Sequence, residues 1–287
     1  MEEKTMKFTK ILSLVLAFML LFAFVSCGST DDAKDTDTDA VSDTGADTAA
    51  DTAADTAADT EGTTENDTIV MATNAYFPPY EYYEGENIIG IDAEIAAKIA
   101  ETLGKTLVIE DMEFNSITTA VNEGSVDFGM AGMTITEERL LEVDFSNSYA
   151  NGVQVIIVKE DSPITTVDDL YADGAAYKVG VQLGTTGDTY SSGDFGADRV
   201  VQYVTGNEAV LALAGGSVDC VIIDNEPAKA YVEANEGLKI LDTTYADEDY
   251  AICVKKGNTE LLDAINAAIV ELTADGTIDS IIAKYIK

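Results

Sequence analysis

The sequence predicts an α/β protein of two related lobes separated by a hinged cleft. From residue 68 to the C-terminus, strand-like apolar runs alternate with helical segments, which indicates parallel-type sheets with helices on both faces. This order occurs twice, and each copy contains the letters Gly-Ser-Val-Asp between a helix and a strand, at residues 124–127 and 216–219. Strand-like runs at 153–158 and 250–254 flank the second copy, so the chain crosses between the lobes twice, which makes a hinge.

The first copy begins with a buried strand at residues 69–72. The next helix has apolar residues on one face, with Asp92 as its predicted N-cap and Gly104 just after its end. Three further elements complete this copy: a strand at 107–109, a helix at 116–123 stopped by Gly124, and a strand at 126–130.

The second copy repeats this pattern. Its predicted elements are strands at 178–181, 200–204 and 218–223 and a helix at 209–214 with Asn207 as its cap. Two C-terminal helices, 259–274 and 278–285, are expected to complete the first lobe. We therefore assign residues 68–151 and 252–287 to the first lobe and residues 152–251 to the second.

Composition excludes several classes of protein. The formal net charge is −37, from 53 acidic and 16 basic residues, and such a field repels the phosphate backbone of nucleic acids. The sequence contains no histidine, which removes Ser-His-Asp and Cys-His catalysis and the imidazole zinc sites. We predict no metal site and no cofactor.

The N-terminus has the pattern of a secretory leader. Three lysines among the first ten residues precede an apolar run at 11–25, too short for a comfortable membrane span. The following Phe-Val-Ser-Cys-Gly resembles a bacterial lipobox, so we predict a signal peptide at 1–27 and lipidation of Cys27. A plain membrane anchor with Cys27 as a chance thiol is the alternative, and the start can be Met1 or Met6.

Residues 28–67 have the composition of a tether. This segment is rich in Asp, Thr and Ala, with an Asp-Thr-Ala-Ala repeat from Asp47, and Val41 is its one large apolar residue. Such a segment cannot bury enough apolar surface to offset the entropy of ordering, so we predict an acidic, disordered tether. A helix is the alternative, but Thr and Asp are poor helix formers.

Motifs near the predicted strand ends carry a family resemblance. They lie at residues 72–81, 90–94, 126–139, 143–146, 179–186 and 222–228, and the most specific is Thr-Ile-Thr-Glu-Glu-Arg at 134–139. Together they resemble the family 3 extracellular solute-binding proteins of ABC amino-acid importers. The resemblance implies a two-lobed periplasmic-binding-protein (Venus flytrap) fold of type II, without catalysis. It also implies a monomer outside the cytoplasm, anchored to the bacterial cell membrane, which captures a small polar L-amino acid and delivers it to an ABC transporter permease.

Arg139 is the candidate for the ligand's α-carboxylate, which a guanidinium can grip with two parallel hydrogen bonds. A surface ion pair with Glu142 is the structural alternative. The segment from Thr134 to Glu137 also fits a capping box. By resemblance, Thr134 adds a hydroxyl and Gly132 a backbone carbonyl. Thr186 similarly adds a donor at a helix N-terminus, where unpaired N–H groups favour anions.

Asp224 is the candidate for the ligand's α-ammonium. It ends a strand that the sequence predicts to be buried, where a carboxylate needs a partner. Its alternative role is as an N-cap of the following helix, for which Asn225 is an equally good candidate.

The remaining candidates surround the ligand's side chain by resemblance. Phe77 and Phe114 match positions that sandwich the side chain, although core packing is the ordinary role of phenylalanine. Asn74 and Gln182 match positions that contact its distal end, and both are neutral.

Two questions stay open at this point. Cys220 and Cys253 can form a disulfide after secretion or remain buried free thiols. A dehydratase-like enzyme on the same fold, with Glu226 as its only candidate acid, is one alternative function, and a sensory binding module is the other.

Overall fold

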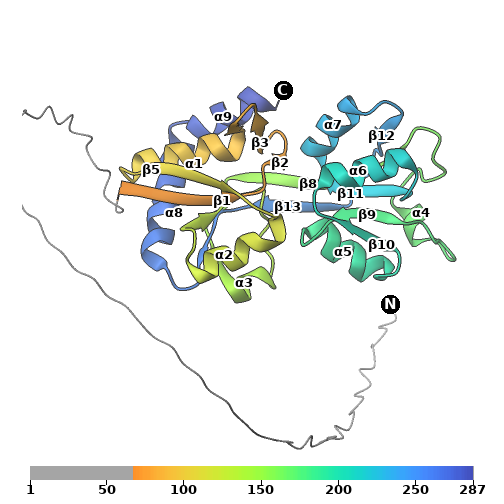
Figure 1. Ribbon diagram of the computed structural model, residues 1–287, viewed down its shortest axis with the longest axis horizontal. Coiled ribbons are helices and arrows are strands. Elements are labelled where there is room, and N and C mark those ends of the chain that lie inside the picture. The colour runs from red at the N-terminus through yellow and green to blue at the C-terminus, as the bar shows by residue number, and fades with distance from the viewer. Residues whose placement is uncertain (1–66, 287) are drawn as a thin grey trace, which may run out of the picture. The chain divides into compact units, whose positions relative to one another are not determined.

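The computed structural model describes residues 67–286 (Figure 1). The predicted signal peptide, Cys27 and nearly all of the predicted tether therefore lie outside the described residues. Within residues 67–286, no helix combines the length and apolar character needed to cross a bilayer.

The first sheet mixes parallel and antiparallel strands. In spatial order it comprises β5 (Thr106–Asp111), β1 (Thr68–Thr73), β6 (Phe128–Gly129), β14 (Cys253–Lys255) and β7 (Val143–Phe145). Strand β1 pairs in parallel with β5 and β6, whereas β14 runs antiparallel to β6 and β7. A small antiparallel sheet of β2 (Tyr76–Phe77), β3 (Glu81–Glu84) and β4 (Asn87–Ile89) follows β1. We call these two sheets and their helices lobe 1.

The second sheet has the same plan. In spatial order it comprises β10 (Val200–Tyr203), β9 (Val179–Gln182), β11 (Cys220–Asp224), β8 (Ala150–Lys159) and β12 (Leu238–Ile240), and β13 (Ala246–Tyr250) also pairs with β8. Strands β10, β9 and β11 are parallel, and β8 is antiparallel to β11. We call this sheet and its helices lobe 2; the lobe boundaries derived from the sequence stay a prediction.

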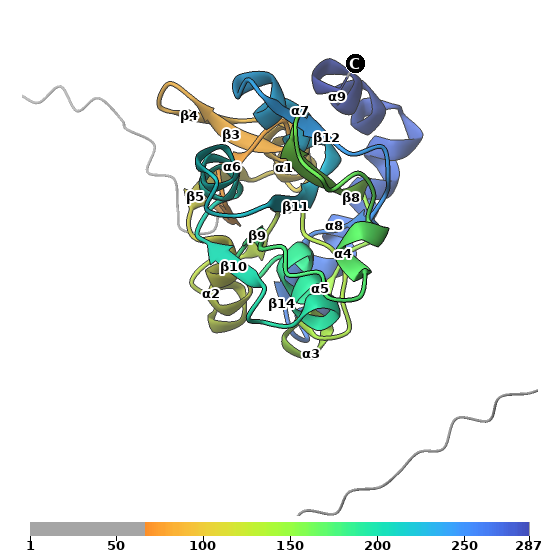
Figure 2. The same ribbon diagram turned by 90° about the vertical axis from the view of Figure 1, so that its right-hand side faces the viewer.

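Helices cover both faces of each sheet. In lobe 1 they are α1 (Ile91–Thr102), η2 (Phe114–Ser116), α2 (Ile117–Glu123), α3 (Arg139–Glu142), α8 (Thr259–Ala274) and α9 (Thr277–Tyr285). In lobe 2 they are α4 (Asp168–Tyr171), α5 (Thr186–Phe195), α6 (Gly206–Gly215) and α7 (Asn225–Ala234). Helices α6 and α7 lie on one face of the lobe 2 sheet and α5 lies on the other (Figures 1 and 2). Apolar residues three to four positions apart give each helix one buried face. In lobe 1, for example, Ile95 and Ile99 of α1 pack in the same buried cluster as Ile265 of α8.

The two crossings between the lobes run side by side. Strand β8 enters lobe 2 and β13 leaves it, and they pair antiparallel from Ala150 with Tyr250 to Gln154 with Ala246. Gly152 lies opposite Glu248, and a Cβ at Gly152 would come within 2.3 Å of the Tyr250 ring. The hinge is therefore a two-stranded ribbon with a buried tyrosine packed against its backbone.

Four local predictions are wrong for reasons that the structure shows. Residues 250–254 are not one strand, because β13 ends at Tyr250 and β14 begins at Cys253 in the other sheet. Helix α1 is capped by Gly90, not Asp92, whose side chain accepts from Gly132 N–H instead; a Cβ at residue 90 would lie 2.1 Å from the Tyr80 carbonyl oxygen.

The other two concern helix caps. The cap of α6 is Thr205, which forms a capping box with Glu208, so Asn207 lies inside the helix. The predicted capping box of Thr134 is absent, because Thr134 forms a β-bridge with Tyr250 and α3 begins five residues later, at Arg139.

Candidate ligand-binding site

One cavity between the lobes brings together all nine ligand-binding residues predicted from the sequence. Its non-atom space is about 320 Å³, and it is lined by Asn74, Phe77, Glu81, Phe114, Ala131, Gly132, Thr134, Arg139, Gln182, Thr185, Thr186 and Asp224. That each of the nine contacts a ligand stays a prediction.

Strand ends explain the convergence. Asn74 follows β1, Gln182 ends β9 and Asp224 ends β11, so each lies at the carboxyl end of a parallel strand. The carboxyl ends of parallel strands meet at one edge of a sheet, which is where open α/β sheets bind ligands. The two sheets present these edges to the same cavity.

Arg139 contacts both lobes. Its Nη1 donates to the Thr134 carbonyl oxygen at 2.7 Å in lobe 1, and its Nη2 donates to the Gly184 carbonyl oxygen at 3.1 Å in lobe 2. The guanidinium carbon lies 5.3 Å from the centre of the Phe114 ring, a cation–π contact. Burial lowers the pKa of Arg139 from its ordinary value. The alternative ion pair with Glu142 is not among the ion pairs of residues 67–286.

Asp224 is held by two donors from the hinge. Gln154 Nε2 donates to its Oδ2 at 2.7 Å, and the Tyr250 hydroxyl donates to its Oδ1. Asp224 is the N-cap residue of α7 by position, but its side chain makes no capping hydrogen bond there. Burial and the nearby charge of Glu248 raise the pKa of Asp224 to about 8.

Glu248 is a buried carboxylate that sequence reasoning missed. Its Oε2 accepts hydrogen bonds from Thr134 Oγ1 at 3.1 Å and from Gln154 Nε2 at 3.0 Å. Gln154 Nε2 also approaches Thr186 Oγ1 at 3.4 Å, so a single amide links Asp224 and Thr186 of lobe 2 to Glu248 of the hinge. The missed signal is the alternation of β13, in which Glu248 and Tyr250 face inward.

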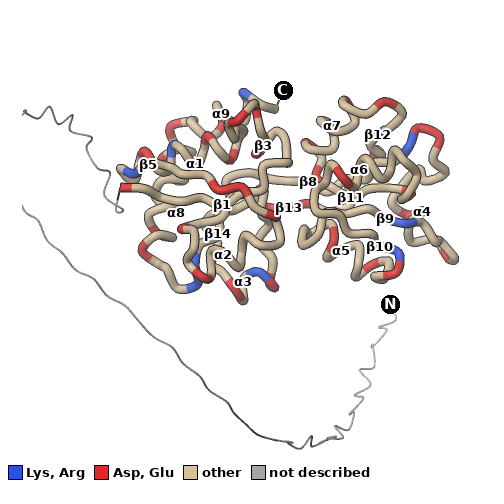
Figure 3. The backbone as a smooth tube through the Cα atoms, viewed as in Figure 1, with Lys and Arg blue, Asp and Glu red and all other residues tan. Residues whose placement is uncertain are grey.

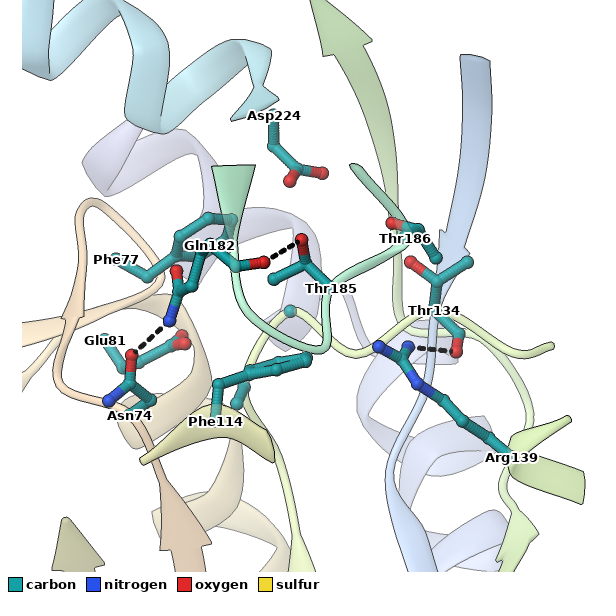
Figure 4. A pocket seen from close by; sticks show the side chains of 12 residues that line it. Asn74, Phe77, Glu81, Phe114, Thr134, Arg139, Gln182, Thr185, Thr186 and Asp224 are labelled. Atoms are coloured by element: carbon teal, nitrogen blue, oxygen red, sulfur yellow. Dashed lines mark hydrogen bonds between the residues drawn. The ribbon is translucent and has the colours of Figure 1, made fainter. Parts of the chain in front are cut away.

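The opposite end of the cavity is bounded by amides and aromatic rings. Gln182 Nε2 donates to Asn74 Oδ1 at 2.9 Å across the two lobes, and Asn74 Nδ2 donates to the Met112 carbonyl oxygen at 2.8 Å. Figure 4 shows Phe77, Asn74 and Gln182 on the side of the cavity away from Arg139. These residues define the distal end.

The backbone at Gly132 leaves no room for a side chain. Its φ is +52°, a left-handed conformation, and a Cβ would lie 2.8 Å from Phe77 Cε1. Its N–H donates to Asp92 Oδ2 at 2.8 Å. Asp92, misassigned as a helix cap, is thus a buried acceptor that fixes the backbone at the predicted ammonium site.

Glu81 also lines the cavity and was not predicted as a site residue. It is fully buried at the start of β3, and neither carboxylate oxygen receives a hydrogen bond from the residues that the structure describes. The motif at 72–81 contains Glu81, but the sequence alone does not show that this side chain faces the cavity.

Two further observations answer open points. Cys220 and Cys253 are buried free thiols in different sheets, which confirms the second of the two alternatives. Glu226, the one acid considered for an enzyme, forms an ion pair with Lys229 at 2.6 Å and is not among the residues that line the cavity.

Comparisons with known proteins agree on one family. The model of the bacterial extracellular solute-binding proteins, family 3, matches residues 69–287. The arginine-binding extracellular protein ArtP of Bacillus subtilis is 31% identical over 227 residues, which cover 76% of this chain and 85% of the relative. The ABC transporter glutamine-binding protein GlnH of the same species is 34% identical over 203 residues, covering 70% and 73%.

Solved structures show the same likeness. An ancestral arginine-binding protein bound to glutamine is 39% identical, with a TM-score of 0.72, and the match covers 77% of this chain and 98% of that one. The arginine-, lysine-, histidine-binding protein ArtJ from Geobacillus stearothermophilus is 30% identical, with a TM-score of 0.71, and the match covers 76% and 95%.

Proposed function

The chain belongs to family 3 of the bacterial extracellular solute-binding proteins, and we propose that it captures one L-α-amino acid by clamping the α-carboxylate and the α-ammonium between its lobes. The predicted family, the type II two-lobed fold and the amino-acid-binding role in ABC import are confirmed. The named relatives are binding proteins, and we propose a binding protein without catalysis.

One observation supports the proposal that Arg139 and Asp224 clamp the ligand. Arg139 and Asp224 line the same cavity from different lobes; Asp224 is buried, Arg139 is half-buried, and each has hydrogen-bonding capacity directed into the cavity (Figure 4). An α-amino acid presents one anion and one cation at its α-carbon, which Arg139 and Asp224 complement. Because each lobe supplies only part of the hydrogen bonds, the closed arrangement binds the ligand more tightly and becomes the populated state.

The other predicted residues complete this end. Thr134 and Thr186 supply hydroxyl groups, and the Gly132 carbonyl group supplies an acceptor for the ammonium. The N-terminus of α5, at which Thr186 lies, adds N–H groups that favour the carboxylate. Phe77 and Phe114 pack against the ligand's side chain, with Asn74 and Gln182 at its far end.

Calorimetry with Lys substitutions tests the clamp. We expect Arg139→Lys to bind amino acids more weakly, because a lysine cannot form two parallel bonds to a carboxylate. Arg199→Lys is the matched control, since Arg199 donates to the Leu170 and Tyr177 carbonyl oxygens and stacks on Phe195, away from the cavity. Equal affinities of Arg139→Lys and wild type, with intact circular dichroism, would refute the clamp.

We also propose that the protein is a monomer anchored outside the cytoplasm by lipidated Cys27. The lipobox-like sequence and the acidic segment 28–67 support this. We expect Cys27→Ala to release the protein from membranes or to block maturation, whereas Ser29→Ala leaves it anchored. Fractionation of cells with metabolic labelling by a fatty acid measures both, and full membrane retention of a processed Cys27→Ala protein would contradict the anchor.

A further inference from the structure

The α-amino clamp leaves one buried charge of the cavity unexplained, the carboxyl group of Glu81. Glu81 has 0% exposure, and no N–H or O–H of the described residues donates to either of its oxygens. A buried carboxylate without a donor is costly, and native proteins rarely leave one unpaired. Glu81 therefore needs either a proton or a partner from outside the chain.

Asp92 lies against Glu81, and its negative charge makes ionisation of the Glu81 carboxyl group still more costly. Asp92 is also fully buried, and its Oδ2 accepts from Gly132 N–H and from the Tyr149 hydroxyl, both at 2.8 Å, while the Glu81 carboxyl group is a further side-chain hydrogen-bond partner of Asp92. Two buried carboxyl groups in contact cannot both ionise without a cation. The Asp92 carboxylate already has two donors, so the retained proton belongs to Glu81.

Among the residues that the structure describes, no Lys or Arg pairs with Glu81. The ionisable groups that face it are Asp92 of α1, Asp224 at the end of β11, Tyr80, Tyr149 of the segment before β8, and Tyr231 of α7. Burial, followed by the charge of Asp92, raises the pKa of Glu81 well above its ordinary value. Arg139, the cation that lines the cavity, is on the other side of it and is engaged by two carbonyl oxygens (Figure 4).

The position of Glu81 matches the distal end of a bound amino acid. In Figure 4, Glu81 lies beside Asn74 and away from Arg139 and Thr134, with Phe77 and Phe114 near it. A ligand whose carboxylate meets Arg139 extends its side chain past the two rings toward Glu81. Aromatic faces attract cations. The negative field of the acidic residues in both lobes (Figure 3) also favours a cationic ligand.

We propose that the ligand is a cationic L-amino acid, and that Glu81 exchanges its proton for the guanidinium or ammonium group at the end of the ligand's side chain. The O–H bond of the Glu81 carboxylic acid breaks, the proton leaves to solvent, and the new carboxylate accepts hydrogen bonds from the ligand's cation. The inference rests on the proposed function, because the clamp fixes which end of the ligand faces Glu81.

Calorimetry with L-arginine and L-citrulline tests the exchange. The two share the α-amino acid group and nearly the same length, but the ureido group of citrulline is neutral. Each is titrated into the purified protein at one pH in two buffers of different ionisation enthalpy, which gives the number of protons released. We expect arginine to bind more tightly and to release up to one proton more than citrulline. Any proton lost from Asp224 is common to both ligands and cancels in the difference.

Variants of one strand give the matched control. Glu81→Gln should weaken arginine binding roughly 30-fold or more, leave citrulline within a few-fold and abolish the difference in proton release. Glu84→Gln removes the same charge from an exposed position of β3 and should change neither ligand.

Two results with wild-type protein would overturn the exchange without any variant. One is equal or tighter binding of citrulline, and the other is equal proton release by the two ligands. Equal weakening of both ligands in Glu81→Gln would also overturn it. If neutral amino acids bind and arginine does not, only this inference fails; if no amino acid binds, the proposed function fails as well.

Discussion

The two ends of the cavity each contain a buried carboxyl group, but the protein treats them differently. Asp224 accepts hydrogen bonds from Gln154 and from Tyr250, both in the hinge ribbon. Glu81 accepts none from the described residues. Donors within the protein hold Asp224 in place for any amino acid, whereas the charge of Glu81 depends on what the ligand brings. We therefore expect the end with Asp224, the proximal end, to bind the group that all amino acids share, and the distal end with Glu81 to select among side chains.

The largest expected effect falls on the proximal end. Asp224→Asn should weaken every amino acid that binds by about 2–5 kcal/mol, or roughly 30-fold to several-thousand-fold, because the ligand's ammonium is left buried without its counter-charge. Calorimetry with arginine and citrulline measures this. If Asp224→Asn weakened the binding of arginine alone, Asp224 would not bind the α-ammonium group that both ligands share.

A second prediction concerns pH. Burial raises the pKa of Asp224 to about 8 and of Asp92 to about 6, so the native protein keeps protons that the unfolded chain has released. Stability of the ligand-free protein should therefore fall as pH rises from about 5.5 to 8. Thermal denaturation across this range measures the slope.

Glu248 sharpens this prediction, because its charge is the second cause of the raised Asp224 pKa. Glu248→Gln should lower that pKa and flatten the fall in stability with pH. Asp247→Asn is the control, since Asp247 is exposed in the same strand. Stability that rises with pH in wild type would contradict the assignment.

A smaller effect is expected at Phe114, which lies between the two ends. Its ring contacts the Arg139 guanidinium, so Phe114→Leu should cost about 0.5–1.5 kcal/mol of affinity, or roughly 2- to 12-fold. The loss should be similar for arginine and citrulline, because both use Arg139. A much larger loss for arginine would show instead that the ring acts mainly on the ligand's side chain.

Removing residues 28–67 is expected to leave the affinity for amino acids unchanged. A protein that begins at Thr68 should bind amino acids as the longer chain does, because residues 28–67 have too few apolar residues to pack on the lobes. Calorimetry of the two lengths in parallel tests this, and a clear loss of affinity would assign residues 28–67 a part in binding.

The sequence predicted the fold well where patterns are local. Both C-terminal helices and most strands lie within two residues of their predicted bounds, since apolar spacing and Gly stops such as Gly124 determine them. Errors arose where a distant contact decides. The N-cap of α1 is Gly90, where the Tyr80 backbone leaves no room for a side chain. Nothing near residue 90 in the sequence reveals that contact.

The candidate site shows the same limit. The nine predicted residues line one cavity; Asn74, Gln182 and Asp224 reach it from strand ends, whereas Arg139 begins α3 and Phe114 begins η2. Glu81, Glu248 and Gln154 were missed, since each has its role through partners far along the chain. Glu248 lies in the acidic run Ala-Asp-Glu-Asp, which has the composition of an exposed loop, and only its pairing with β8 turns alternate residues inward.

The paired crossings of β8 and β13 limit how the lobes can move. A single linker swivels about every bond, but a ribbon of five paired positions resists shear and rotation, and it bends or twists as a unit. We therefore expect the lobes to close along nearly one path whatever the side chain of the amino acid. If so, every filled cavity gives the protein the same outer surface, and a docking protein that never touches the amino acid could distinguish a loaded carrier from an empty one.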